Sequence, residues 1–310
     1  MSEHIRPADD DSSIGLQIGR RLVEEVLAPL KHTFVGKDEV IDLLGVCLAG
    51  GENLFILGPP GTAKSAIVHE LGRRLDGRTF DYLLTRFTEP NELFGPFDIR
   101  KLREGELVTN TEGMLPESSM VFLDELLNAN SAILNSLLMV LNERIFRRGK
   151  ETIALPLVMV VGASNSLPKD DALSALFDRF LLRVYCGNVP EEKLIDVLDA
   201  GWKIDAGILE RDTSLLMDDI RKLQSHIHKV DILTARAEYL ELLQRLRHAG
   251  IDISDRRAVK LQRLIAASAL LCGRTVATPS DFWVLQYIWD RQEQQETLKA
   301  IVTDAMKKDM

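Results

Sequence analysis

The stretch NLFILGPPGTAKSAIVHELGRRL, residues 53–75, decides the fold. An apolar run ends at a loop of glycine and proline, and a helical pattern begins at Lys64. A strand, a glycine-rich loop and a helix N-terminus in this order form a cradle for the phosphates of a nucleotide. Lys64 would reach the β- and γ-phosphates, and the hydroxyl of Ser65 would bind Mg²⁺. The residues expected around the nucleotide are consecutive: Gly58, Pro59, Pro60, Gly61, Thr62, Ala63, Lys64, Ser65 and Ala66.

The loop departs from GxxxxGK[ST] at one position, because Ala63 stands where the pattern has glycine. The alanine is tolerated there if its φ is negative, since only a positive φ penalises a Cβ atom. The alternative is a surface turn that happens to contain GPPG. The strand before the loop and the helix after it favour the phosphate cradle.

The composition describes an ordinary globular protein. The chain has 310 residues and a net charge of −9, with a pI of about 5.3, so no strongly basic field recruits nucleic acid. The three cysteines lie far apart and show no metal or disulfide spacing. The polar start is no signal peptide, and the longest apolar run, residues 155–163, is too short to cross a bilayer. We expect a cytoplasmic protein without membrane insertion.

The pattern along the chain predicts three segments: a disordered N-terminus at 1–13, an α/β core at 14–188 and an all-helical domain at 189–310. Within the core, apolar runs and helical patterns alternate, which predicts a parallel sheet flanked by helices. The expected strands are 54–57, 80–84, 120–123, 157–163 and 181–185. The expected core helices are 15–31, 37–50, 64–75, 131–143 and 170–177.

Two inserts interrupt the core. Residues 97–111 and 144–155 alternate apolar with polar residues, so each predicts a β-hairpin, with turns at 104–105 and 149–150. After about residue 190 the strand patterns stop. The expected helices of the second domain are 191–200, 214–230, 234–249, 254–272 and 280–306, the last with a break near residue 292.

Two carboxylates follow an apolar strand in the stretch MVFLDE, residues 120–125. A buried parallel strand delivers its terminal side chains to the edge of the sheet where ligands bind. Asp124 could hold Mg²⁺ and Glu125 could act as general base on a water molecule. An apolar run followed by Asp-Glu is also a common solvated strand end. Its position about 60 residues beyond Lys64 favours the functional interpretation.

Three further positions are candidates for a catalytic role. Asn165 follows the next apolar run and could orient water, or it could cap the following turn. Arg179, in ALFDRF, is either a surface charge held by Asp178 or an arginine finger that enters a neighbouring subunit. In SDRR, Arg256 or Arg257 could contact the phosphates, or both could belong to a first-turn salt-bridge cluster.

In their order along the chain, these segments resemble the motifs of the AAA+ ATPases. GPPGTAKS resembles Walker A, MVFLDE Walker B, GASN sensor 1, ALFDRF the arginine-finger segment and SDRR sensor 2. TEPNELFGPFDI, the hairpin after it and GMLPESSMVFLDE resemble the MoxR family, which commonly has alanine before the lysine. LNSLLMVLNERIFRRG and ISDRR resemble its RavA branch, although RavA proteins continue beyond the residue at which this chain ends.

The resemblance implies an AAA+ P-loop core with two hairpin inserts and an α-helical lid. It implies a homo-oligomeric ring, commonly a hexamer, with ATP and Mg²⁺ between subunits. It assigns Lys64, Ser65, Asp124, Glu125 and Asn165 to the subunit's own site. It assigns Arg179 to the neighbouring site and Arg256, or alternatively Arg257, to sensor 2. Val35 and Gly36 fall where the family contacts adenine.

The resemblance also implies a class of activity. MoxR proteins are chaperone-like remodelling ATPases that commonly work with partners bearing a von Willebrand factor A domain. We therefore expect an ATP-hydrolysing remodeller of a protein client. The alternatives are a DNA-acting motor, for which the basic residues near the second hairpin give some support, a nucleotide switch, and a motor subunit for metal insertion like that of magnesium chelatase. The acidic pI disfavours a nucleic-acid partner.

Overall fold

The computed structural model describes residues 8–148, 151–168, 171–208 and 215–307. Its centre is a five-stranded sheet in the order β2-β3-β6-β1-β7, in which every pair is parallel. The strands are β1 (Leu54–Leu57), β2 (Thr79–Leu83), β3 (Met120–Asp124), β6 (Met159–Ser164) and β7 (Leu182–Tyr185). All five expected strands are confirmed to within two residues at each end.

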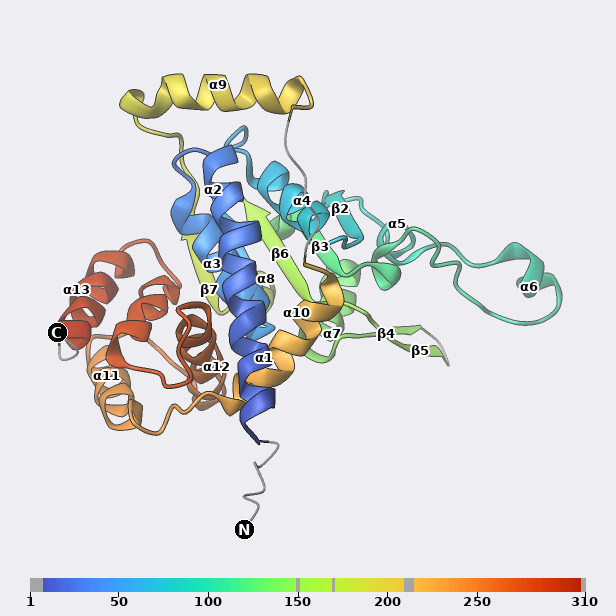
Figure 1. The fold of residues 1–310 in the computed structure, drawn as a ribbon. Helices are drawn as coiled ribbons and strands as arrows, with labels where there is room; N and C mark the ends of the chain where they lie inside the picture. Colours follow the sequence, from blue (N-terminus) through green and yellow to red (C-terminus); the bar gives the residue numbers. More distant parts are fainter. Residues whose placement is uncertain (1–7, 149–150, 169–170, 209–214, 308–310) are drawn as a thin grey trace, which may run out of the picture.

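Helices cover both faces of the sheet (Figure 1). On one face α3 (Asp38–Gly50) contacts β1 and β7, and α4 (Lys64–Arg74) contacts β2 and β3. Helices α7 (Ser131–Glu143) and α8 (Asp171–Phe177) contact each other. They lie in the connections from β3 to β6 and from β6 to β7, which run along the sheet in the direction opposite to the connection from β1 through α4 to β2. Because such crossovers are right-handed, this pair lies on the other face. Strands β1 and β6 are therefore buried along their whole length.

The N-terminal helix is longer than expected and is not α-helical throughout. Helix α1 (Ala8–Arg21) continues through a π-helical segment (Leu22–Leu27) into α2 (Ala28–Thr33). Residues 8–13, which we expected to be disordered, belong to α1; residues 1–7 lie outside the described residues. The prediction of a disordered N-terminus is therefore wrong for its second half.

The first insert differs from the predicted hairpin. Helix α5 (Pro90–Phe94) precedes the insert, which contains α6 (Ile99–Arg103), and the two sides of the insert meet in one antiparallel bridge, Phe97 with Thr109. The side chain of Asp98 accepts hydrogen bonds from the N–H groups of Arg100 and Lys101 and so caps α6. This local cap favours a helical turn over a ladder. The second insert is the predicted hairpin, β4 (Ile145–Arg148) with β5 (Glu151–Ala154); its expected turn at 149–150 lies outside the described residues.

The chain after β7 is helical, as expected. It comprises α9 (Leu194–Asp205), α10 (Met217–His226), α11 (Arg236–His248), α12 (Asp255–Leu271), a 3₁₀ segment (Pro279–Tyr287) and α13 (Gln294–Met306). Four short 3₁₀ turns complete the elements of the described residues: Leu115–Glu117, Leu126–Asn128, Glu191–Lys193 and Ile227–Lys229. The break near residue 292 is confirmed, because the 3₁₀ segment ends before α13 begins.

These later helices occupy three places (Figure 1). Helix α9 crosses the end of the core that carries α2 and contacts it. Helix α10 packs against α1 and α3, whereas α11 to α13 form a separate group beside β7. Helix α12 of this group also packs against α3 and α1. The boundary expected at 187–190 therefore marks the end of the sheet, while α9, α10 and α12 all pack on helices of the core.

Candidate nucleotide site

The loop after β1 is shaped by very close backbone contacts. The N–H of Gly58 donates to the carbonyl of Ser164 at 3.0 Å, which joins the loop to the end of β6. A Cβ atom at Gly58 would lie 2.1 Å from the carbonyl oxygen of Cys186. No side chain fits at that distance, so the sequence requires glycine where the loop leaves the sheet.

The backbone of Ala63 has a conformation that residues with a Cβ atom rarely adopt. Its φ is +66°, in the left-handed region, immediately before α4 begins at Lys64. The condition of a negative φ is therefore not met, and the alanine carries the strain that a Cβ atom brings there. This conformation turns the chain sharply from the loop into the helix, so that the first N–H groups of α4 lie at the loop.

Lys64 points back into its own loop. The side chain is buried, and Nζ donates to the carbonyls of Gly58 at 2.9 Å and Pro59 at 2.8 Å. The hydroxyl of Thr62 donates to the same Pro59 carbonyl at 3.0 Å. The ammonium group is thus held at the mouth of the loop. A cation at this place matches the charge of a polyphosphate.

The ends of β3 and β6 bring the carboxylates and the amide to the same edge. The N–H of Glu125 donates to Oδ1 of Asp124 at 2.9 Å, and Glu125 itself has φ +49°. The backbone N–H of Asn165 hydrogen-bonds the Glu125 carboxylate. β3 and β6 are adjacent in the sheet. The structure therefore brings together Asp124, Glu125, Asn165 and Lys64, as the sequence predicts.

The surroundings of Glu125 change its acidity. Burial raises the pKa of this carboxyl, and the charge of Asp124 raises it further, whereas the Lys64 ammonium and the Asn165 N–H act in the opposite direction. The net pKa is above the ordinary value. A carboxylate with a raised pKa is better matched to accepting a proton near neutral pH.

Two cavities flank the loop. One, of about 340 Å³, is mostly apolar and lies between the segment 33–37, the residues Gly61–Ala63 with Ala66, and α9. Val35 lines it, and Gly36, at φ +73°, lies next to it in the same segment. The other, of about 470 Å³, is lined by residues 57–60, Asn165 and Tyr185. An apolar cavity on one side and a polar one on the other suit a base and a triphosphate.

Arg179 lies in the link between α8 and β7 and lines neither of these cavities. Its Nε is buried, and among the described residues it has no hydrogen-bond partner. Within the described part of the chain, no ion pair joins it to Asp178, which instead lies beside Arg183. The expected support of Arg179 by Asp178 is therefore wrong.

Neither arginine of SDRR reaches the loop of its own chain. Arg256 donates to Oδ1 of Asn142 at 3.3 Å. Arg257 is buried and forms an ion pair with Asp290 at 3.2 Å, and its other Nη donates to the carbonyl of Ile288. The first-turn cluster that we kept as the alternative is present in part, because Asp255 pairs with Arg247 at 2.9 Å.

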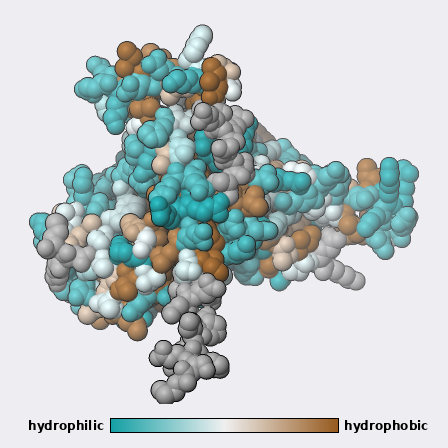
Figure 2. Space-filling view, viewed as in Figure 1, coloured by the Kyte–Doolittle hydropathy of each residue, from teal (hydrophilic) through white to brown (hydrophobic). Residues whose placement is uncertain are grey.

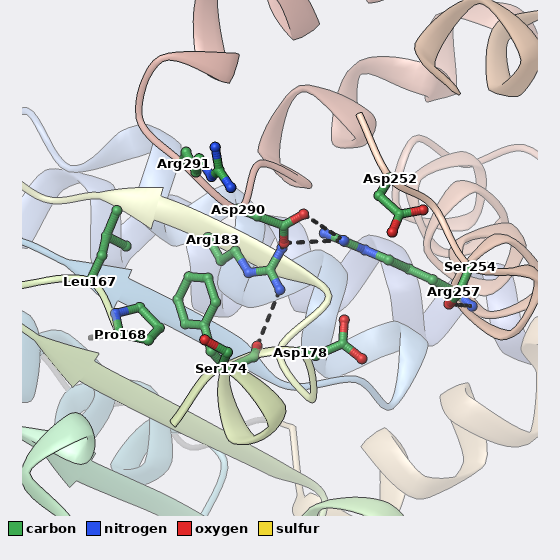
Figure 3. A pocket seen from close by; sticks show the side chains of 11 residues that line it. Leu167, Pro168, Ser174, Asp178, Arg183, Asp252, Ser254, Arg257, Asp290 and Arg291 are labelled. Atoms are coloured by element: carbon green, nitrogen blue, oxygen red, sulfur yellow. Dashed lines mark hydrogen bonds and ion pairs between the residues drawn. The ribbon is translucent and has the colours of Figure 1, made fainter. Parts of the chain in front are cut away.

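Sequence reasoning missed the group that Arg257 joins (Figure 3). Arg183, fully buried on β7, donates to Oδ1 of Asp290 at 2.7 Å and to the carbonyl of Phe177 at 3.2 Å. Burial and the charge of Arg257 lower the pKa of Arg183 to about 9. These groups line a cavity of about 660 Å³ between the core and the last helices. The signal was a single arginine inside the apolar run LLRVY.

Comparisons with known proteins agree with this geometry. The family model described as the MoxR domain in the MoxR-vWA-beta-propeller ternary systems matches residues 20–225, and an AAA lid domain model matches residues 216–302. The chain belongs to the MoxR family of AAA+ ATPases. The RavA branch expected above is a finer assignment than these matches give.

Individual relatives of this MoxR chain cover most of its length. An uncharacterized protein of Methanocaldococcus jannaschii is 34% identical over 273 residues, which cover 86% of this chain and 71% of the relative. Chaperone MoxR1 of Mycobacterium tuberculosis is 22% identical over 281 residues, covering 86% and 74%. The crystal structure of a candidate ATPase from Cytophaga hutchinsonii superposes with a TM-score of 0.74 at 19% identity and covers 97% of each chain. That likeness supports the MoxR fold.

The same residues can be tested for a metal and for a membrane segment. No group of three or more His, Cys, Asp or Glu side chains that could hold a metal gathers among the described residues. Ser65 lies in the first turn of α4 and Asp124 ends β3, so a Mg²⁺ ion there would also need phosphate oxygens and water. Over the described ranges, none of the helices is both long and apolar enough to cross a bilayer.

Proposed function

We propose that this MoxR protein binds ATP with Mg²⁺ at the loop 58–65 and hydrolyses it to ADP and phosphate. The observation that carries the proposal is the meeting of Lys64, Glu125 and Asn165 at one edge of the sheet. The apolar cavity with Val35, Gly36 and Ala66 would receive adenine. The residues 57–60 and Asn165, which line the polar cavity, would face the phosphates.

Each side chain has a specific role in this proposal. Lys64 binds the β- and γ-phosphates, and Ser65 and Asp124 hold Mg²⁺, which neutralises phosphate charge. Glu125 takes a proton from the attacking water, and Asn165 orients that water. Arg179 acts on the ATP of a neighbouring subunit, because it lines neither cavity of its own chain. An arginine in that position is worth roughly 10³–10⁵ in rate.

We propose that the chain forms a homo-oligomeric ring, with the hexamer of the family as the first expectation. For Arg256 or Arg257 to act as sensor 2, the last helices would have to contact the nucleotide of another subunit, since neither reaches its own loop. Of the two, Arg256 is the more exposed and keeps our original assignment.

The proposed work of the ring is the remodelling of a protein client with a partner that bears a von Willebrand factor A domain. The matching family model is named for systems that also contain a β-propeller, which makes such a protein a second candidate partner. The first insert offers a contact surface, because Ile99, Leu102 and Leu107 are 68%, 50% and 51% exposed. Figure 2 shows apolar atoms among hydrophilic ones on this projecting segment.

The DNA-acting alternative loses support in the structure. Of the basic residues near the second hairpin, Arg144 donates to Asn53, and Arg148 donates to the carbonyl of Gly95 and lies over the ring of Phe97. These contacts use two of the guanidinium groups inside the protein. Arg147 is exposed, and Lys150 lies outside the described residues. ATP hydrolysis that rises with added DNA and falls steeply with salt would revive this alternative.

The experiment that tests the proposal is Glu125→Gln. The amide keeps the size of the side chain but cannot accept the proton, so we expect ATP affinity close to that of the wild type and no measurable turnover. Fluorescent-nucleotide binding and phosphate release measure the two quantities. Unchanged hydrolysis by this variant would remove Glu125 from the mechanism. With ATP present, the same variant is the form to use for capturing the client.

A further inference from the structure

One buried amide joins three distant segments of the chain. Asn53 precedes β1 and is 1% exposed. Its Nδ2 donates to the carbonyl of Arg179 at 3.4 Å. Its Oδ1 accepts from Nη2 of Arg144 at 2.8 Å and from the N–H of Val160 at 3.2 Å. A buried amide with three partners holds one orientation, because any rotation would leave polar groups unpaired.

The Arg179 end of this contact lies in the short link between α8 and β7. The N–H of Arg179 donates to the carbonyl of Leu176 at 3.0 Å, and the next residue, Phe180, is fully buried. Asn53 binds the remaining backbone group, the carbonyl. The guanidinium stands at the end of a long side chain, so a small rotation of this peptide moves it much further.

The Arg144 end connects the amide to the second insert. Arg144 follows α7, and its carbonyl accepts from the N–H of Leu155 at 2.8 Å, which closes the base of the β4–β5 hairpin. Further out, the ring of Phe146 stacks on that of Phe94 at 4.6 Å. The hairpin is thereby packed on α5, the helix before the first insert. The base of the second insert and the Arg179 link therefore meet at Asn53.

We infer that Asn53 is a positioning residue for Arg179 and connects it to the base of the hairpin. The inference rests on the proposed function, in which Arg179 acts on the ATP of a neighbouring subunit. Asn53 touches no nucleotide in this account. It fixes the backbone from which Arg179 extends, and through Arg144 that backbone shares a contact with the base of the β4–β5 hairpin.

The substitution Asn53→Asp separates the two halves of the contact. A carboxylate still accepts the hydrogen bonds from Arg144 and from the N–H of Val160. It no longer donates one to the carbonyl of Arg179, and its negative charge repels that carbonyl. The Arg144 guanidinium supplies a counter-charge for the new carboxylate. We expect kcat for ATP to fall by roughly 10- to 100-fold, the cost of a misplacement of about 1 Å. The KM for ATP stays unchanged, because the subunit's own loop is intact.

Asn130→Asp is the matched control. Asn130 caps α7, and its Nδ2 donates to the carbonyls of Arg86 at 3.2 Å and Thr88 at 2.8 Å, while its Oδ1 accepts from backbone N–H groups. The same substitution there also removes amide donation and keeps the acceptor. It does so away from Arg179. We expect it to keep a kcat close to that of the wild type.

A mixing assay gives a readout that general destabilisation would not produce. A subunit with Asn53→Asp has an intact loop, and a subunit with Lys64→Ala has an intact Arg179. Mixed assemblies of the two should therefore turn over ATP faster than either variant alone. Absence of this gain, with co-assembly verified, overturns the inference.

Two further results separate the inference from the proposed function. Wild-type turnover by Arg179→Ala would refute the role of Arg179 itself. An inactive Arg179→Ala beside a fully active Asn53→Asp would refute only the inference. If Asn53→Asp does not fold, Arg144→Met tests the same contact with Asn53 intact. It should lower kcat in the same direction by a smaller factor, and a wild-type kcat would overturn the inference.

Discussion

Because Ala63 has a left-handed conformation, we expect glycine at this position to make the protein more stable than alanine, and valine to make it less stable. At φ +66° an L-residue with a Cβ atom bears about 1–2 kcal/mol of strain. Ala63→Gly removes that strain but adds about 0.4–1 kcal/mol of backbone freedom to the unfolded chain. The difference predicts a gain in unfolding free energy of about 0.5–1 kcal/mol. Ala63→Val should lose stability, because a β-branched residue tolerates this region least.

Ala300 is the control for this series. It is exposed in α13, where the backbone is helical. Glycine there should cost about 1 kcal/mol, and valine should cost less than glycine. From most to least stable, the expected order is therefore Gly, Ala, Val at position 63 and Ala, Val, Gly at position 300.

Urea denaturation followed by circular dichroism, at equal m-values, measures the change in unfolding free energy for each of the four substitutions. Because the change at position 63 leaves Lys64 and the backbone path in place, Ala63→Gly should also hydrolyse ATP at close to the wild-type rate. If Ala63→Gly lowers stability as much as Ala300→Gly does, the backbone at position 63 is not left-handed. The reasoning on the loop would then be refuted.

Three further substitutions test the packing around the site. Asp290→Asn should lower the free energy of unfolding, measured by urea denaturation, by about 2 kcal/mol, because two buried guanidinium groups lose a partly exposed counter-charge. The control Asp304→Asn, at a surface ion pair, should change it by less than about 0.5 kcal/mol. Equal effects of the two substitutions would contradict this. Gly58→Ala should lower stability by about 3 kcal/mol, since its Cβ would overlap the Cys186 carbonyl, and a stable variant would show that the loop can move away. Ala66→Trp should fill the apolar cavity and weaken ATP binding by roughly tenfold, about 1.4 kcal/mol, in a fluorescent-nucleotide titration. An unchanged affinity would show that adenine binds elsewhere.

The sequence predicts the sheet and the loop because both depend on residues that are close together in the sequence. Apolar runs bounded by glycine or by carboxylates mark strands that are buried on two faces. The order of β1, the loop and α4 leaves a single arrangement for Lys64. The meeting of Glu125 and Asn165 follows as well, since the carboxyl ends of adjacent parallel strands share one edge.

The remaining features depend on information that a local pattern does not contain. The close approach of Gly58 to the backbone of Cys186, just after β7, joins segments that are far apart in the sequence. Arg183 and Asp290 lie 107 residues apart, so their contact appears only once the last helices are placed. The first insert was predicted as strands because its alternation outweighed a single capping aspartate, Asp98.

The central claim is that one chain grips ATP with its loop while a neighbour supplies Arg179. Mixing Lys64→Ala subunits with Arg179→Ala subunits tests it most directly, because each variant lacks what the other retains. Both should be inactive alone, and the mixture should recover a part of the wild-type turnover that depends on the mixing ratio. A mixture that co-assembles and remains inactive at every ratio would contradict the claim.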